Sequence, residues 1–263
     1  MADTIFALSS GAVPSGVAVI RVSGPGTREI VETLAGKVSQ PRKTMLAKLR
    51  DPETKDVLDE ALVLYFEGPS SFTGEDVAEF QCHGGRAVVS SLLSVLSRFS
   101  NCRPAEAGEF TRRAFHNDRL DLAEAEGLAD LIHAETEGQR KQALSQMEGA
   151  LSARVESWRA ELIAALAHIE ADIDFSDEDL PEGVAAAVRP KIAALHNDLL
   201  SALEDRTGER LRDGVQIVVT GPPNAGKSSF INKLVGRDAL IVSDEAGTTR
   251  DLVDLHLDIA GFP

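Results

Sequence analysis

The chain has 263 residues, enough for one or two domains, and its patterns predict two domains and part of a third. Its formal net charge of −15 argues against a protein that grips RNA through a basic face of its own, although an acidic balance is also ordinary for soluble proteins. The cysteines, Cys82 and Cys102, lack metal-site spacing and fit a reducing cytoplasm. No signal peptide is expected at the start, and no apolar run of about 18 residues predicts a membrane span.

Residues 1–118 alternate strand and helix signals and predict an α+β domain. The expected strands are Thr4–Leu8, Val17–Val22, Leu62–Phe66 and Val77–Cys82, and the expected helices are Thr27–Leu34 and Arg86–Phe99. Pro104 is expected to open another helix, because proline is favoured in the first helical turn. Cys82 is predicted to be a core residue at a strand end, with half of a metal site shared with His83 as the alternative.

Residues 119–207 have helical periodicity, and their apolar residues recur at steps of three and four. One long amphipathic helix is predicted from the stripe Leu144, Met147, Leu151, Val155, Trp158, Leu162, Leu166, Ile169 and Ile173. A second helix is predicted from Val188, Ile192, Leu195, Leu199 and Leu203. The acidic residues 177–182 between them predict a solvated loop with a turn at Pro181 and Gly183. Trp158 is expected in the core rather than on a stacking platform, and residues 211–214 are expected to form a hinge.

Residues 221–228 match the phosphate-loop pattern G-x-x-x-x-G-K-[ST]. Val215–Thr220 predicts a buried strand before the loop and Ser229–Val235 a helix after it, which is the context that the motif requires. In such a loop, backbone N–H groups and the helix N-terminus face the phosphates. Lys227 would then reach the β- and γ-phosphates and Ser228 would ligate Mg²⁺. The alternative is an ordinary glycine turn between a strand and a helix.

Residues 241–251 carry two threonines, Thr248 and Thr249, at a distance that suits a γ-phosphate sensor. Taken alone, the same residues could form a capped turn. Residues 255–260 then alternate between apolar and other side chains, which predicts a half-buried strand.

Taken together, these segments resemble the tRNA-modification GTPase family called MnmE or TrmE. The resemblance is carried by residues 223–229 and 241–251, by 16–24, by 71–76 running to 83–85, and by 104–111 running to 117–122. It extends from the first residues of the chain to the last. The family's later motifs, the Asp-x-x-Gly of switch II and the Asn-Lys-x-Asp that reads guanine, are absent, as is its cysteine-bearing C-terminus. We therefore expect a C-terminally truncated member of the family.

The resemblance implies three parts. Residues 1–118 would be a tetrahydrofolate-binding-like domain that also dimerises, and residues 119–208 would be the first part of an α-helical domain. Residues 209–263 would begin an α/β P-loop GTPase domain, limited to the phosphate loop and switch I. The implied assembly is a homodimer.

The resemblance also implies the ligands of the nucleotide site. GTP would be bound by residues of the two loops: Asn224, Ala225, Gly226, Lys227, Ser228, Ser229, Ser243, Asp244, Glu245, Ala246, Gly247, Thr248 and Thr249. Mg²⁺ would be held by Ser228 and Thr249. K⁺ would be held by Asn224, Ser243, Glu245 and Thr248. Lys227 and Asn224 would act in catalysis through the phosphate and the K⁺, because a cation stabilises charge on the transferring phosphoryl group. Asn224 could instead satisfy its own turn.

In the N-terminal domain, Arg21, Glu79 and Arg119 occupy the positions at which the family binds 5-formyl-tetrahydrofolate or a related one-carbon folate. Arg21 and Glu79 both interrupt apolar strands, and a charge there needs a partner. The alternatives are a structural ion pair between them, or two residues on the wet face of a strand. The family often has lysine where this chain has Arg119, which keeps the charge and changes the shape.

The implied function is GTP-driven modification at C5 of the wobble uridine of certain tRNAs. An FAD-dependent partner would complete a heterotetramer and hold most of the tRNA. For the 263 residues alone we expect weak or absent GTP binding and negligible hydrolysis, because about 55 residues bury too little apolar surface to complete that domain. The rival functions are a ribosome-assembly or translational GTPase, a folate-dependent one-carbon enzyme or folate-binding module, and a non-catalytic dimer scaffold. Residues 1–263 do not distinguish guanine from adenine.

Overall fold

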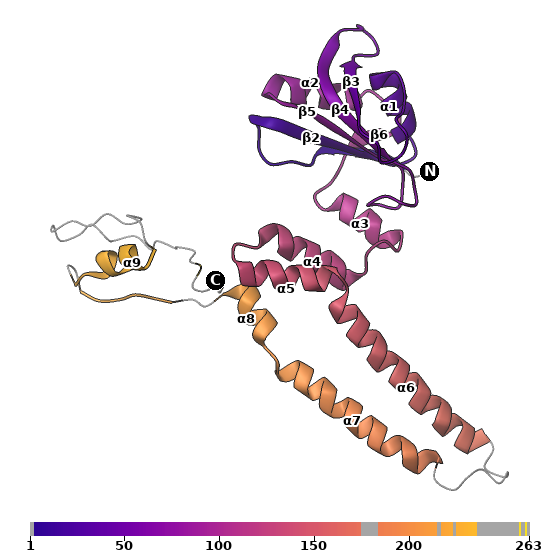
Figure 1. Ribbon diagram of the computed structural model, residues 1–263, viewed down its shortest axis with the longest axis vertical. Coiled ribbons are helices and arrows are strands. Elements are labelled where there is room, and N and C mark those ends of the chain that lie inside the picture. The colour runs from indigo at the N-terminus through magenta and orange to yellow at the C-terminus, as the bar shows by residue number, and fades with distance from the viewer. Residues whose placement is uncertain are drawn as a thin grey trace. The chain divides into compact units, whose positions relative to one another are not determined.

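The computed structural model describes residues 3–174, 184–214, 217–222 and 225–235, together with Asp258 and Gly261. Two compact units divide the chain, Met1–Leu122 and Ala123–Pro263. The first contains the sheet and the second contains most of the helices (Figure 1).

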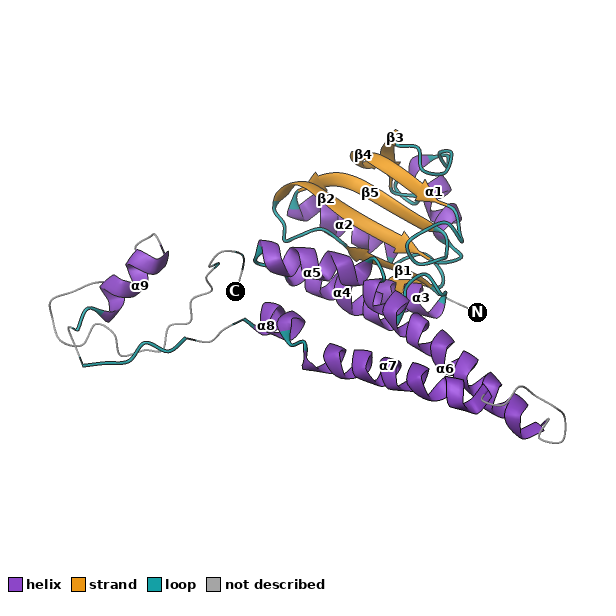
Figure 2. Cartoon of the chain, turned by 60° about the horizontal axis from the view of Figure 1, so that its bottom comes forward, coloured by secondary structure: helices purple, strands orange, loops and turns teal. Residues whose placement is uncertain are grey.

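The first unit is built on a six-stranded sheet in the order β3-β4-β5-β2-β1-β6. Its strands are β1 (Thr4–Leu8), β2 (Ser15–Ser23), β3 (Met45–Arg50), β4 (Val57–Phe66), β5 (Val77–Gly84) and β6 (Cys102–Pro104). Neighbouring strands are antiparallel except β1 and β6, which pair in parallel. Helices α1 (Thr27–Ala35) and α2 (Arg86–Leu96) lie on one face of this sheet, and α3 (Glu109–His116) follows β6 (Figure 2).

The core of this unit forms where the sheet meets α1 and α2. Alternate residues of β2, among them Ala18, Ile20 and Val22, point to the helices and are buried, because successive side chains of a strand face opposite ways. Cys82 belongs to this core, as predicted. His83 faces the other way and pairs with Asp59 at 2.8 Å, so these neighbours do not form half of a metal site together. The residues between the core positions of β2 and β5 occupy the opposite face.

The four predicted strands and the helices predicted over Thr27–Leu34 and Arg86–Phe99 are confirmed, although β4 begins five residues before the predicted Leu62, and the α+β class is confirmed with them. The sequence analysis missed β3 and β6. Strand β3 lies at the edge of the sheet with exposed charges, and β6 is three residues long, so neither has a strong apolar pattern. The helix predicted to open at Pro104 is wrong. Pro104 ends β6, where it pairs with Phe6, and α3 begins only at Glu109.

The second unit holds α4 (Leu122–His133), α5 (Glu137–Met147), α6 (Ala150–Asp174), α7 (Val184–Glu204), α8 (Thr207–Asp213) and α9 (Lys227–Val235). Helices α6 and α7 run side by side as a long hairpin (Figure 1). The predicted single helix over residues 144–173 is wrong, because the helix is interrupted at Gly149 and two helices, α5 and α6, stand in its place. Gly149 has a φ of 83°, a left-handed conformation that ends helices and favours glycine.

Much of the predicted apolar stripe remains exposed in the hairpin, because in the described residues each long helix has the other as its main neighbour. Ala165, Val188 and Leu195 are buried, whereas residues such as Leu162, Leu166 and Ile173 are exposed. The core position predicted for Trp158 is wrong. Its ring is only half-buried, its indole N–H donates to Asp198 of α7 at 2.6 Å, and the Arg154 guanidinium lies over it.

Three further predictions concern the end of the chain. Helix α8 was not predicted, and it extends to Asp213, so only Gly214 remains of the expected hinge. The buried strand predicted over Val215–Thr220 is wrong for residues 217–220, which have no strand pairing and expose Ile217 and Val218 by 68% and 82%. The predicted helix after the phosphate loop is confirmed as α9. The predicted loop at 177–182, its turn at Pro181 and Gly183, residues 241–251 and most of 255–260 lie outside the described residues.

Candidate functional site

The phosphate-loop segment places Lys227 at the first position of α9, directly after Gly226, whose φ is 84°. The Lys227 ammonium donates to the carbonyl oxygens of Gly221 at 3.1 Å and Pro222 at 2.9 Å. Ser228 follows in the first turn of the helix and is half-buried. The cation, the hydroxyl and the N-terminal end of the helix therefore lie together, which is an arrangement suited to a phosphate group.

The structure describes only some of the other predicted residues of the nucleotide site. Ala225 and Ser229 are exposed beside the loop. Asn224, which was expected to hold K⁺, and Ser243, Asp244, Glu245, Ala246, Gly247, Thr248 and Thr249 lie outside the described residues. Among the described residues, no group of three or more His, Cys, Asp or Glu side chains could hold a metal ion. For Mg²⁺, the hydroxyl of Ser228 is the one predicted ligand that the structure describes, and an oxygen donor suits this ion.

The second candidate site lies on the sheet face opposite α1 and α2. Arg21 of β2 and Glu79 of β5 are register partners. The Arg21 Nε and Nη2 atoms both donate to Glu79 Oε1, at 3.0 and 2.7 Å, and the side chains are 26% and 18% exposed. The structure thus brings two of the three predicted folate residues into direct contact, as the ion-pair alternative also expected.

Two aromatic rings enclose this arginine. The Arg21 guanidinium carbon lies 5.4 Å from the Phe72 ring centroid and 5.6 Å from that of Phe110. Phe72 belongs to the loop of residues 68–76, and Phe110 belongs to α3. Cation–π contacts of this length are attractive, and they limit the orientations that the guanidinium can adopt. The site therefore combines an ion pair with two aromatic rings. Arg21 and Glu79 could form hydrogen bonds with a ligand, and the Phe72 and Phe110 rings could pack against a planar group.

Arg119 lies beside the same 68–76 loop. Gly74 has a φ of 78°, and a Cβ there would come within 2.8 Å of Asn117 and 3.2 Å of the Arg119 side chain. The Asn117 amide also donates to the Thr73 carbonyl oxygen at 2.6 Å. The stem of Arg119 thus packs against Gly74, while the residue is exposed overall, leaving its guanidinium accessible to an anionic group.

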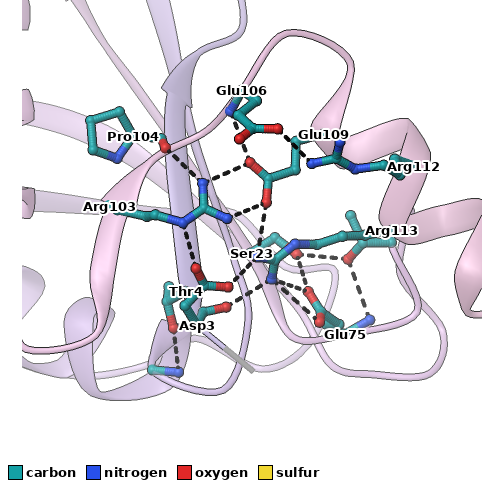
Figure 3. Close-up of polar contacts among 12 residues, drawn as sticks. Asp3, Thr4, Ser23, Glu75, Arg103, Pro104, Glu106, Glu109, Arg112 and Arg113 are labelled. Carbon is teal, nitrogen blue, oxygen red and sulfur yellow. Dashed lines mark hydrogen bonds and ion pairs between the residues drawn. The ribbon is translucent and has the colours of Figure 1, made fainter. Parts of the chain in front are cut away.

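Glu75 of the same loop belongs to a cluster of ion pairs that we call the charge network: Asp3, Glu75, Arg103, Glu109 and Arg113 (Figure 3). Arg103 forms a fork with both carboxylate oxygens of Glu109, at 2.9 and 2.6 Å. This contact, which outweighs the opposing effect of burial, lowers the pKa of Glu109 to about 2. The hydrogen bond from Arg103 also lowers the pKa of Asp3.

Sequence reasoning missed the roles of Phe72, Phe110, Glu75 and Arg113. The first three lie within the segments that carried the family resemblance, residues 71–76 and 104–111, so those segments held the available signal. Nothing in the local pattern indicated that residues so distant in the chain would meet around Arg21.

Comparison with known proteins covers the whole chain. Residues 4–119 match the family profile described as GTP-binding protein TrmE N-terminus, and residues 122–260 match the MnmE helical domain profile. Curated relatives named tRNA modification GTPase MnmE are 55% identical in Parvibaculum lavamentivorans, over 99% of this chain and 60% of the relative, and 57% identical in Beijerinckia indica, over 98% and 58%. A relative of the same name in Caulobacter vibrioides is 56% identical over 100% of this chain and 58% of its own length. The chain spans about three fifths of the curated relatives that it matches.

Proposed function

Because the chain belongs to the MnmE (TrmE) family of tRNA modification GTPases, we propose that the protein it represents binds and hydrolyses GTP to drive tRNA modification. The observation that carries the proposal is the position of Lys227 and Ser228 at the start of α9, directly after a glycine loop. On nucleotide binding, the Lys227 ammonium would exchange the loop carbonyls for β- and γ-phosphate oxygens. Bound Mg²⁺ would supply positive charge to the phosphates, with Ser228 and Thr249 among its ligands.

The finer part of the proposal follows the family resemblance. Asn224, Ser243, Glu245 and Thr248 are proposed to hold K⁺ beside the phosphates. The reaction is proposed to act at C5 of the wobble uridine together with an FAD-dependent partner. The net charge of −15 favours a tRNA held mainly by that partner. Both cysteines are free, which favours a cytoplasmic protein, and no described helix is long and apolar enough to cross a membrane.

For the 263 residues alone, we propose weak nucleotide binding. Residues 217–220 pair with no strand of the described chain, and Phe230 and Leu234 of α9 are exposed, so within the described residues little apolar contact holds the loop in place. The test is titration with a fluorescent guanine nucleotide in K⁺ and Mg²⁺, with an adenine analogue as the competitor. The variant Lys227→Ala should abolish whatever binding occurs, whereas Lys233→Ala, later in the same helix, should retain it. Binding as tight as that of intact GTPases would contradict the weak-binding proposal, and equal loss in both variants would exclude a phosphate-loop site.

A second proposed function is folate binding by the N-terminal unit, which is also proposed to form a homodimer. It is favoured by the enclosed Arg21–Glu79 pair and by the exposed Arg119. Glu79 would accept from ring N–H groups, and Arg119 would pair with the anionic tail. Calorimetric titration with 5-formyl-tetrahydrofolate tests this function. We expect saturable binding that Arg21→Ala and Glu79→Gln weaken and that Arg112→Ala, an exposed arginine of α3, leaves unchanged. A folded chain that binds no folate would exclude it.

A further inference from the structure

Polar side chains on both sides of Phe72 form hydrogen bonds that hold the 68–76 loop in place. The Ser71 hydroxyl bonds to the Glu75 carbonyl, and the Thr73 hydroxyl lies 2.7 Å from that of Ser23 in β2. At the end of the loop, both carboxylate oxygens of Asp76 are occupied, one by the Tyr65 hydroxyl at 2.6 Å and the other by the Gly68 N–H at 3.0 Å. The loop therefore presents the Phe72 ring from a fixed backbone.

The charge network holds both ring-bearing segments. Glu75, in the loop, accepts from the Ser23 hydroxyl at 3.0 Å and from Arg113 of α3 at 3.1 Å. Arg113 in turn bonds to Glu109 at 3.2 Å and to Asp3, and Glu109 is the immediate neighbour of Phe110. Figure 3 shows the Arg113 side chain directed toward Glu75 and Asp3, and the Arg103 guanidinium hydrogen-bonded to Glu109. One arginine thus ties the Phe72 loop to the Phe110 helix.

Stabilisation of the core does not account for this arrangement. The hydrophobic cluster of the first unit is formed by the sheet with α1 and α2, and it includes no residue of the 68–76 loop or of α3. The side chains of Glu109 and Arg113 are only 3% and 13% exposed. Buried ion pairs cost desolvation energy and often contribute little net stability, but they can hold segments in one geometry. Here the segments that they hold are those that carry the two rings nearest the Arg21 guanidinium.

We propose that Glu75 and Arg113 are positioning residues for the Arg21 site, fixing the Phe72 loop and the Phe110 helix so that both rings enclose the Arg21–Glu79 pair before a ligand binds. The inference rests on the proposed folate function for the identity of the ligand, but the enclosure of Arg21 is a property of the ligand-free chain. Neither residue contacts Arg21 or Glu79 in any described interaction. Their effect must therefore pass through Phe72 and Phe110.

The ligand-free test is NMR of the Arg21 Nε–H resonance in the full 263-residue chain. Two rings near the guanidinium should move this resonance away from its usual shift through their ring currents. We expect Glu75→Gln and Arg113→Lys to reduce that displacement by at least half, while the chain keeps its thermal midpoint within a few degrees. Arg112→Ala removes a neighbouring exposed guanidinium that pairs with Glu106 at the surface, and it should leave the resonance unchanged. An unchanged resonance in both network variants would overturn the proposal, whether or not the chain binds folate.

The ligand test is a double-mutant cycle on affinity for 5-formyl-tetrahydrofolate. Glu75→Gln should weaken binding by about tenfold, the lower end of the loss that follows when the groups that orient metal ligands are changed. If Glu75 acts through the ring, the same change should have little further effect in a Phe72→Ala background. An equal loss in both backgrounds would contradict positioning through Phe72. If the wild-type chain binds no folate, the proposed ligand is wrong, and the NMR result alone decides whether Glu75 and Arg113 position the rings.

Discussion

The Arg21 site and the phosphate-loop segment are built in opposite ways. Arg21 lies in a central strand, its ion-pair partner comes from β5, and its two rings come from a loop and a helix much later in the chain. Lys227 instead donates to carbonyls five and six residues before it, and the residues leading into that loop are exposed. Among the described residues, the segment with the most recognisable motif is thus held mainly by local contacts. The site with the weaker motif is held by contacts from distant parts of the sequence.

Of the changes considered, the removal of Arg113 should have the largest effect on the stability of the N-terminal unit. Arg113→Ala removes the arginine that pairs with the half-buried Glu75, and it leaves the buried Glu109 and Asp3 with Arg103 alone, which should destabilise the N-terminal unit by about 3 kcal/mol. Tyr65, the only tyrosine, reports this unit, whereas Trp158, the only tryptophan, reports the α6–α7 hairpin. In urea unfolding, the Tyr65 transition should move to lower urea and the Trp158 transition should not. Arg112→Ala is the matched control, and equal shifts of both transitions would show that the network is not specific to the N-terminal unit.

Acid should weaken the same network. The Arg103 guanidinium lowers the pKa of Glu109 to about 2, below its usual 4.5, so ionised Glu109 stabilises the fold fully above about pH 4.5. That contribution should be lost as the pH falls from 4.5 towards 2. We expect the unfolding free energy of the N-terminal unit to decrease over this range, and the decrease to be smaller in Glu109→Gln. Urea unfolding followed through Tyr65 measures it. Glu106→Gln, an exposed carboxylate nearby, should keep the wild-type slope, and the same slope in Glu109→Gln would contradict the assignment.

The hydrogen bond that anchors the 68–76 loop to Tyr65 should have a moderate effect, on the ionisation of the Tyr65 phenol. Burial, reinforced by the hydrogen bond to Asp76, raises the pKa of Tyr65 to about 12. The protonated phenol therefore stabilises the fold fully below pH 10, and this contribution is lost as the pH rises towards 12. Absorbance at the phenolate band should show no ionisation near pH 10 while the chain is folded. Asp76→Asn should lower the midpoint, and a wild-type midpoint near 10 in folded protein would contradict an anchored loop.

The smallest effect is expected at the hairpin. Asp198→Asn weakens the contacts from Trp158 and Arg154 on an exposed surface, where such pairs contribute little stability. We expect a small red shift of Trp158 fluorescence and no change in the Tyr65 transition. Arg159→Ala, which removes an exposed pair within α6 alone, is the control. Loss of the hairpin in Asp198→Asn would mean that this contact holds α6 and α7 together.

The sequence predicted those elements whose local pattern and burial agree. Strands β2 and β5 alternate between the core and the open face, and α1 carries a matching apolar stripe. It failed where a distant contact decides the outcome, as at Pro104, which pairs with Phe6 in the sheet instead of starting a helix. The break at Gly149 had a local signal, a glycine within a helical pattern, that the apolar periodicity obscured.

The same reasoning explains what was found of the sites. Arg21 and Glu79 were identified through the family resemblance, and a charge within an apolar strand was the supporting signal in their own sequence. Glu75 and Arg113 were not, because their importance comes from a contact across 38 residues of chain. The strand predicted before the phosphate loop has β-branched residues, but residues 217–220 find no partner strand in the described chain, and propensity alone does not form a strand.

The most direct test of this contrast is a parallel calorimetric titration of the 263-residue chain with 5-formyl-tetrahydrofolate and with GTP, in one buffer containing K⁺ and Mg²⁺. The account predicts saturable folate binding that Arg21→Ala weakens, and GTP binding that is at least tenfold weaker than the folate binding. Tight GTP binding by a folded chain that binds no folate would contradict it.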